Sequence, residues 1–185
     1  MPLMTVDYQE GALSQQQKDA LAEELTHVVL EIEGGADTPA TRSIAWVRFR
    51  SVPREDWYVG GTSGDTYVSA AGKFLVELNV PEGSMDQGRK SAAHRAITES
   101  FLRVTGTQGK EGAGRSVWVQ IFEWPEGHLA AGGRTASFFG IAKLVGMPLD
   151  GERLTFTRAY FDAKARWYDA HNFPKEATGR ALIRG

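Results

Sequence analysis

An internal repeat constrains the fold of this 185-residue chain more than any other feature. A shift of 72 residues lays the first part of the sequence on the second without a gap. The matches include Glu10-Gly11 on Glu82-Gly83, Trp46-Val47 on Trp118-Val119, Pro53 on Pro125 and Gly60-Gly61 on Gly132-Gly133. Two copies are too few for a solenoid, which needs about three repeats to bury its faces. The repeat therefore predicts two copies packed side by side in one domain.

Each copy has the pattern of a strand, a helix and a second strand. In copy one, Met4, Val6 and Tyr8 alternate with less apolar neighbours, as in a half-buried strand. A capping box of Ser14 and Gln17 opens a helix that Gly34-Gly35 ends, and a second strand covers 44–52. Copy two repeats this plan with a strand around 75–80, a helix over about 86–104, a glycine-rich loop over 107–116 and a strand over 117–122. Strands joined through a helix are parallel. The sequence thus predicts an α/β two-layer sandwich, with a four-stranded sheet and two helices on one face.

The side of the sheet away from the helices is polar but carries two tryptophans. Strand alternation places Trp46 and Trp118 there, together with Thr5, Asp7, Arg48, Arg50, Glu77, Asn79 and Gln120. Tryptophan and arginine are enriched in subunit interfaces, so we favour an interface on this face. The alternative is a solvated face with two isolated tryptophans. On either interpretation, Arg48 and Arg50 are expected to pair with Asp7 and Glu77.

Residues 150–185 lie outside both copies. We therefore divide the chain into a domain of residues 1–149, with copies at 2–72 and 73–149, and a C-terminal arm of residues 150–185. Phe156, Tyr160, Ala163 and Trp167 follow helical spacing and predict an amphipathic helix that packs on its own sheet or on a neighbour. The tail from about Ala177 is expected to be loosely ordered.

Composition excludes several classes of function. Lys and Arg number 21 against 23 Asp and Glu, which leaves no basic excess for a nucleic-acid partner. No apolar run is long enough for a membrane span, and the N-terminus shows no signal peptide, so we expect a cytoplasmic protein. Cysteine is absent, and the histidines at 27, 94, 128 and 171 show no ligand spacing, so no metal is expected.

The duplicated βαβ pattern, with proline directly after the initiator methionine, resembles the tautomerase superfamily. It is most similar to the longer members, the cis-3-chloroacrylic acid dehalogenase group. The resemblance covers roughly residues 2–134 and rests on Pro2-Leu3, Glu10-Gly11, Leu13-Ser14, Lys18, Leu25-Thr26, Val47-x-Phe49-x-x-x-Pro53, Gly60-Gly61, Trp118-Val119, Glu123-x-Pro125 and Gly133-Arg134. It implies a homotrimer with inward-facing sheets and active sites near the subunit contacts.

The resemblance also implies that Pro2 is the catalytic residue. After loss of Met1 the chain would begin with the secondary amine of Pro2. An exposed α-amino group titrates near pH ~8, and an apolar pocket lowers that pKa. Such an amine can transfer a proton or add to a carbonyl without a cofactor. The expected activity is tautomerisation of small enols or α-keto acids such as phenylenolpyruvate. The alternative role for Pro2 is only to begin a strand.

Only a few residues indicate how a substrate would bind. Arg134 matches an arginine of the dehalogenase group, Gln120 falls at a position functional in relatives, and Trp46, Trp57 and Trp118 would wall an aromatic pocket. The group's helix histidine and water-activating glutamate fall on Val29 and Ala131, which argues against dehalogenation. Two alternatives stay open: a proline-dependent hydratase, dehalogenase or decarboxylase of a three-carbon unsaturated acid, and a non-catalytic oligomeric binding protein.

Overall fold

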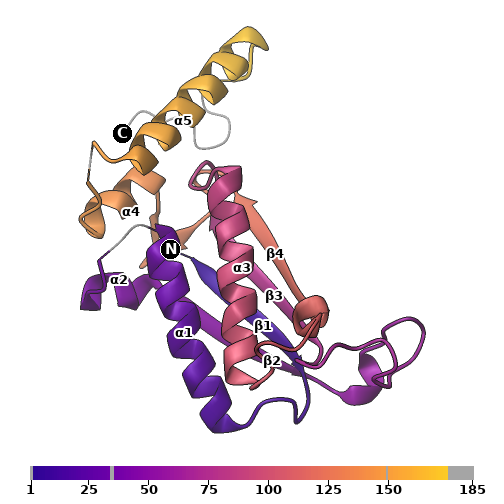
Figure 1. Cartoon of the computed structure of the whole chain (residues 1–185). Helices are drawn as coiled ribbons and strands as arrows, with labels where there is room; N and C mark the ends of the chain where they lie inside the picture. The colour runs from indigo at the N-terminus through magenta and orange to yellow at the C-terminus, as the bar shows by residue number, and fades with distance from the viewer. Residues whose placement is uncertain (1, 34–35, 149, 175–185) are drawn as a thin grey trace.

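A four-stranded mixed sheet with two helices on one face forms the body of the protein (Figure 1). The computed structural model describes residues 2–33, 36–148 and 150–174. The strands β1 (Leu3–Gln9), β2 (Trp46–Val52), β3 (Phe74–Pro81) and β4 (Val117–Trp124) lie in the order β2-β1-β3-β4. Both β1–β2 and β3–β4 are parallel, and the central pair is antiparallel. The helices α1 (Gln15–Glu33) and α3 (Gln87–Val104) cover one face, so the predicted α/β sandwich is confirmed.

The sequence repeat is also a structural repeat with the same offset. Helices α1 and α3 begin at Gln15 and Gln87, and β2 and β4 begin at Trp46 and Trp118. In each unit a Gly-Gly turn follows the second strand. Val59 pairs with Thr62 across the first turn, and β5 (Ala130–Ala131) pairs with β6 (Arg134–Thr135) across the second. All four turn glycines have φ between 57° and 81°, a conformation that favours glycine.

The helix side of the sheet forms the main hydrophobic core. Met4, Val6, Val76 and Leu78 are completely buried, and they pack with the inward faces of both helices. Val47, Phe49, Val119 and Ile121 on the edge strands pack against the same cluster. The predicted assignment of faces is therefore confirmed, and Trp46 and Trp118 lie exposed on the other side.

A short helix, α2 (Pro39–Ile44), occupies the start of the segment predicted as a strand from residue 44. Thr38 caps it by accepting a hydrogen bond from the Thr41 N–H at 3.2 Å, and Pro39 stands at its first turn. The second strand of copy one consequently begins at Trp46. Short 3-10 helices follow β2, at η1 (Arg54–Asp56), and precede β4, at η2 (Ala113–Ser116). The helix end expected at Gly34-Gly35 lies outside the described residues.

Two helices follow β6: α4 (Phe138–Leu144), which lies within copy two of the expected domain, and α5 (Glu152–Ala170), which lies in the C-terminal arm and extends away from the sheet (Figure 1). The predicted apolar stripe of Phe156, Tyr160, Ala163 and Trp167 is wrong, because α5 buries Leu154, Thr157, Phe161 and Tyr168 while Ala163 and Trp167 are exposed. The buried residues pack with Phe138, Ala142 and Met147, and Thr157 donates to the Gly83 carbonyl at 2.9 Å. These tertiary contacts, rather than the helix period, select the buried face. Residue 149 is the last residue of the expected domain, and it lies outside the described residues. The tail from Ala177, which was expected to be loosely ordered, also lies outside them. None of the described helices could span a membrane.

Candidate active site

Pro2 is buried at the start of β1, at the corner where the end of α1, α2 and α4 meet (Figure 1). Its carbonyl accepts a hydrogen bond from the Trp46 N–H at 3.2 Å. The walls around it are Val29 and Leu30 from α1, Thr41 and Ile44 from α2, Ala45, and Ile141 and Val145 from α4 or just after it. The remaining space is about 10 Å³, roughly that of one water molecule. Pro2 therefore lies in an almost closed apolar pocket.

Thr41 is the polar side chain of this lining, and its hydroxyl is already engaged. It is buried and donates to the Ala36 carbonyl at 2.6 Å. No charged side chain stands among the described lining residues. Such surroundings favour a neutral amine over its cation, and they offer no counter-ion to a substrate carboxylate.

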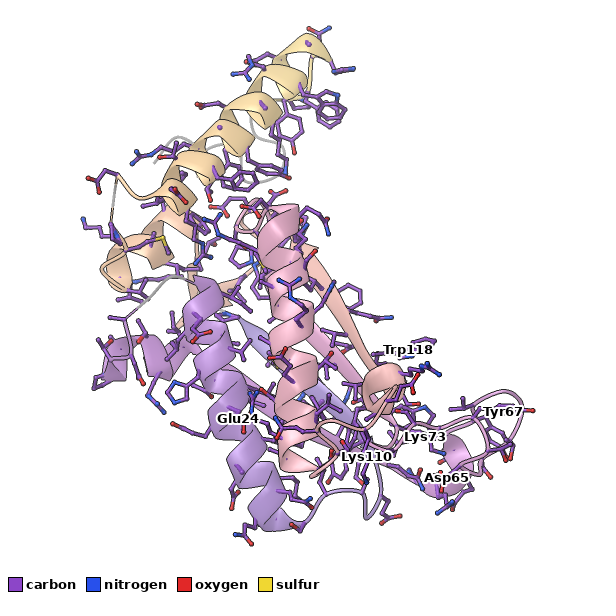
Figure 2. All side chains as sticks on the ribbon, in the orientation of Figure 1. Glu24, Asp65, Tyr67, Lys73, Lys110 and Trp118 are labelled. Atoms are coloured by element: carbon purple, nitrogen blue, oxygen red, sulfur yellow. The ribbon has the colours of Figure 1, made fainter. Side chains whose placement is uncertain are left out.

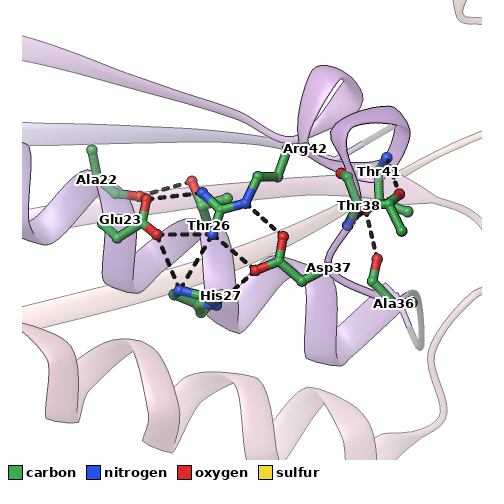
Figure 3. Close-up of polar contacts among 9 residues, drawn as sticks. All are labelled: Ala22, Glu23, Thr26, His27, Ala36, Asp37, Thr38, Thr41 and Arg42. Carbon is green, nitrogen blue, oxygen red and sulfur yellow. Dashed lines mark hydrogen bonds and ion pairs between the residues drawn. The ribbon is translucent and has the colours of Figure 1, made fainter.

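An ion-pair cluster fixes α2 against α1 and thereby places Thr41 and Ile44 beside Pro2 (Figure 3). Arg42 lies 2.8 Å from the Glu23 carboxylate on α1 and 2.6 Å from the Asp37 carboxylate. The hydrogen bonds from Arg42 lower the pKa values of Glu23 and Asp37. His27 also approaches Glu23, at 3.1 Å, and points away from the core as expected.

Buried carboxylates anchor the two helices that follow β6, of which α4 closes the pocket. Glu82 accepts a hydrogen bond from the Glu126 N–H at 2.8 Å and forms an ion pair with Lys164 of α5. Glu126 in turn accepts from the Phe138 N–H at 2.9 Å, at the start of α4, and burial raises the pKa of Glu126. Glu10, the copy-one equivalent of Glu82, is exposed. Both α4 and α5 are thus held against copy two, and α4 reaches over Pro2.

The other predicted site residues do not line this pocket. Trp46 and Trp118 lie at opposite ends of the open face, which is the side of the sheet away from α1 and α3. They are 61% and 67% exposed. Gln120 lies on the same face, level with Glu77, and Arg134 is exposed on β6. Within the described chain, no side chain predicted to contact substrate therefore lines the Pro2 pocket, and Trp46 meets Pro2 through its backbone N–H. Sequence reasoning missed Thr41, Ile44, Ile141 and Val145, which no motif marks.

The polar pairs expected on the open face form only in part. Arg50 donates to Asp7 at 2.8 Å and to Glu77 at 3.2 Å, as predicted. Arg48 instead donates to the Thr5 hydroxyl at 3.2 Å, and no ion pair of Arg48 occurs in the part of the chain that the structure describes. The reason is register, because Arg48 stands opposite Thr5 whereas Arg50 stands opposite Asp7. The described residues also contain no cluster of metal-ligating side chains.

The family model for tautomerase enzymes matches residues 2–66, which contain Pro2 and the whole first βαβ unit. Over residues 2–66 the chain thus resembles tautomerase enzymes, and its two βαβ units have the fold of the longer, duplicated tautomerase structures. No curated protein matches it in sequence.

Solved tautomerase-fold structures resemble the chain over most of its length. Native fused 4-OT has 20% identity and a TM-score of 0.58, over 72% of this chain and 95% of that one. A member of the cis-3-chloroacrylic acid dehalogenase family has 18% identity and a TM-score of 0.58, over 72% and 82%. Macrophage migration inhibitory factor of Toxoplasma gondii has 15% identity and a TM-score of 0.55, over 72% and 99%. At these identities the likeness shows the fold, and part of this chain has no counterpart in them.

Proposed function

We propose that this protein is a cofactor-independent tautomerase that uses the N-terminal amine of Pro2 on small enol or α-keto acids. The observation that carries the proposal is the place of Pro2, buried at the start of a central strand among apolar walls. An amine in such surroundings is poised between its neutral and protonated forms near neutral pH.

The reaction needs only proton transfers. The neutral amine of Pro2 takes a proton from the hydroxyl of the enol, and the resulting ammonium delivers a proton to the neighbouring carbon. The hydroxyl oxygen becomes the carbonyl oxygen, and the amine returns to its neutral form. No electrons are lost or gained overall, so the step requires no redox cofactor. The apolar walls exclude water, which strengthens the interaction between the ammonium and the developing charge.

The substrate carboxylate needs a cation from outside the Pro2 pocket. Arg134 is the candidate that the resemblance supplies, and a second copy of the chain is another source. We propose a homotrimer, which the exposed Trp46 and Trp118 on the open sheet face support. Three of the similar structures are described as trimers of fused 4-OT.

A second candidate function is a non-catalytic, oligomeric binding protein on the same fold. The specific observation in its favour is the closed pocket, because about 10 Å³ does not admit a three-carbon acid. Catalysis therefore requires α4 to move, whereas a binding role does not.

The decisive experiment is ketonisation of phenylenolpyruvate by wild type, Pro2→Ala and Pro53→Ala. Mass spectrometry first establishes that each chain has lost Met1. Because general acid–base catalysis contributes about 10²–10⁴-fold, the Pro2→Ala rate should fall by at least about 100-fold. Pro53 is exposed, so its variant should keep the wild-type rate. Equal activity in wild type and Pro2→Ala would contradict the proposal.

A further inference from the structure

A second and much larger cavity lies at the start of β3, in the position that corresponds to the Pro2 pocket of the first unit. At the offset of the repeat, Phe74 corresponds to Pro2 and Ser116 to Ile44, and Pro2 and Ile44 both line the Pro2 pocket. Phe74 and Ser116 line the second cavity together with Trp118, and its volume is about 530 Å³. Pockets for small molecules typically measure about 300–1,000 Å³. The duplicated fold therefore has two equivalent corners, one closed and one with room for a ligand.

The difference between the corners comes from the segments that cover them. The Pro2 corner is closed by Ile141 and Val145, which follow the second strand of copy two. The Phe74 corner is covered by Trp57, Tyr58 and Tyr67, which follow the second strand of copy one. Each unit thus covers the corner of the other. A helix fills the first corner, and a loop leaves the second one open.

The loop over the second cavity is held in place by its own polar contacts. The buried ammonium of Lys73 donates to the Ser63 carbonyl at 2.9 Å and to the Trp57 carbonyl at 3.3 Å. The Tyr67 ring packs so closely on Gly60 that a Cβ there would lie 2.6 Å from it. Figure 2 shows Tyr67, Lys73 and Trp118 gathered at this end of the sheet. The cavity is therefore largely pre-formed.

Its lining combines aromatic rings with a guanidinium group. Trp118 lines the cavity and is 67% exposed, and its indole N–H donates to the Arg115 carbonyl at 3.3 Å. The Arg115 guanidinium packs on Gly112, where a Cβ would lie 2.8 Å from its Nε. Arg115 is exposed, and it forms no ion pair with any carboxylate among the described residues. Aromatic rings stack on planar ligands, and arginine binds carboxylates through two parallel hydrogen bonds.

We propose that this cavity is a second ligand site that binds an aromatic carboxylate, with the ring between Trp118 and the tyrosines and the carboxylate on Arg115. Phe74 stands where Pro2 stands in the first unit, and an internal residue supplies no free amine. The site binds its ligand without the proton chemistry proposed for Pro2. It is thus independent of the reaction proposed for Pro2.

The test is calorimetric titration of the full-length protein with 2-naphthoate, with uncharged 2-naphthamide as the comparison ligand. Wild type should bind one naphthoate per chain and bind the amide more weakly. Arg115→Gln should weaken naphthoate binding about tenfold, because it removes a charge-assisted hydrogen bond, and Trp118→Leu should weaken both ligands. The matched controls are Trp46→Leu, at the equivalent position of copy one, and Arg95→Gln on the exposed side of α3. Both controls and Pro2→Ala should bind like wild type.

Any of four results would overturn the proposal. One is no binding of naphthoate by wild type at millimolar concentration. Another is equal affinity in wild type and Arg115→Gln, or a loss in Trp46→Leu as large as that in Trp118→Leu. The last result points to a second copy of the chain. If wild type binds no naphthoate and Trp118→Leu lowers the mass measured by light scattering, a neighbouring copy fills the cavity. Because Pro2→Ala tests the other corner, failure of one proposal leaves the other intact.

Discussion

Trp46 and Trp118 make the same hydrogen bond in the two units of the sheet. Each indole N–H donates to the carbonyl three residues earlier, Ser43 at 3.1 Å and Arg115 at 3.3 Å. Because β1 and β3 are antiparallel, the two side chains lie at opposite ends of the sheet. One corner holds Pro2 and the other holds Phe74. The sheet has thus kept its symmetry, and the two units differ in the segments that follow β2 and β4.

The anchoring role of Glu82 predicts that two glutamates at equivalent positions of the repeat contribute very differently to the free energy of unfolding. Glu82→Ala removes the carboxylate that pairs with Lys164 and the acceptor of the Glu126 N–H. We expect the free energy of unfolding to fall by about 2–4 kcal/mol. Glu10→Ala, at the exposed equivalent position, should change it by less than about 0.5 kcal/mol. Urea unfolding followed by circular dichroism measures both. Similar losses in the two variants would show that the arm does not depend on Glu82.

The Arg42 cluster predicts a contribution to the free energy of unfolding that is lost at low pH. Its bonds to Glu23 and Asp37 lower their pKa values from the ordinary 4.5 and 3.8. A lowered pKa in the folded state contributes stability above the ordinary pKa, and the contribution is lost as the pH falls through the lowered value. Arg42→Gln should therefore be less stable than wild type at pH 7. The difference in free energy of unfolding between the two, here called the gap, should disappear below about pH 4. Unfolding titrations at several pH values test this, with Arg95→Gln as the control that shows no such closing gap. A gap that persists at low pH would contradict the assignment.

The open sheet face predicts the oligomeric state. Leu3, Trp46, Asn79 and Phe122 form one row across the sheet, and Trp46 and Phe122 are exposed in the single chain. A homotrimer should have a mass of about 61 kDa by light scattering, three times the 20.3 kDa of the chain. The double variant Trp46→Asp with Phe122→Asp should dissociate, since desolvating two carboxylates in an interface is unfavourable. His94→Asp on the outer side of α3 serves as the control and should keep the wild-type mass. A wild-type mass of one chain would exclude the trimer.

Strand alternation predicted the faces of β1 and β3 because the helices cover only one side, so that Met4 and Thr5 meet different surroundings. The six residues of α2 escaped prediction because a helix this short shows no clear period. On α5 both Tyr160 and Phe161 belong to apolar stripes, and only the packing of Phe161 on Phe139 of α4 decides which of them is fully buried. The closed state of the Pro2 pocket could not be predicted from the sequence either. It depends on Ile141, which is far from Pro2 in sequence.

Ile141 and Leu144 on α4 provide the sharpest test of how the pocket opens. Ile141 is 8% exposed and lies against Pro2, whereas Leu144 on the same helix is 64% exposed. Ile141→Ala should enlarge the pocket and raise kcat/KM for phenylenolpyruvate, at a cost of about 2–3 kcal/mol in the free energy of unfolding. Leu144→Ala should leave both quantities unchanged. Steady-state kinetics at a temperature well below the melting transition of both variants separates the pocket effect from unfolding. A lower kcat/KM in Ile141→Ala with the fold intact would show that closure over Pro2 assists the reaction, since a closed site excludes water and orients the substrate.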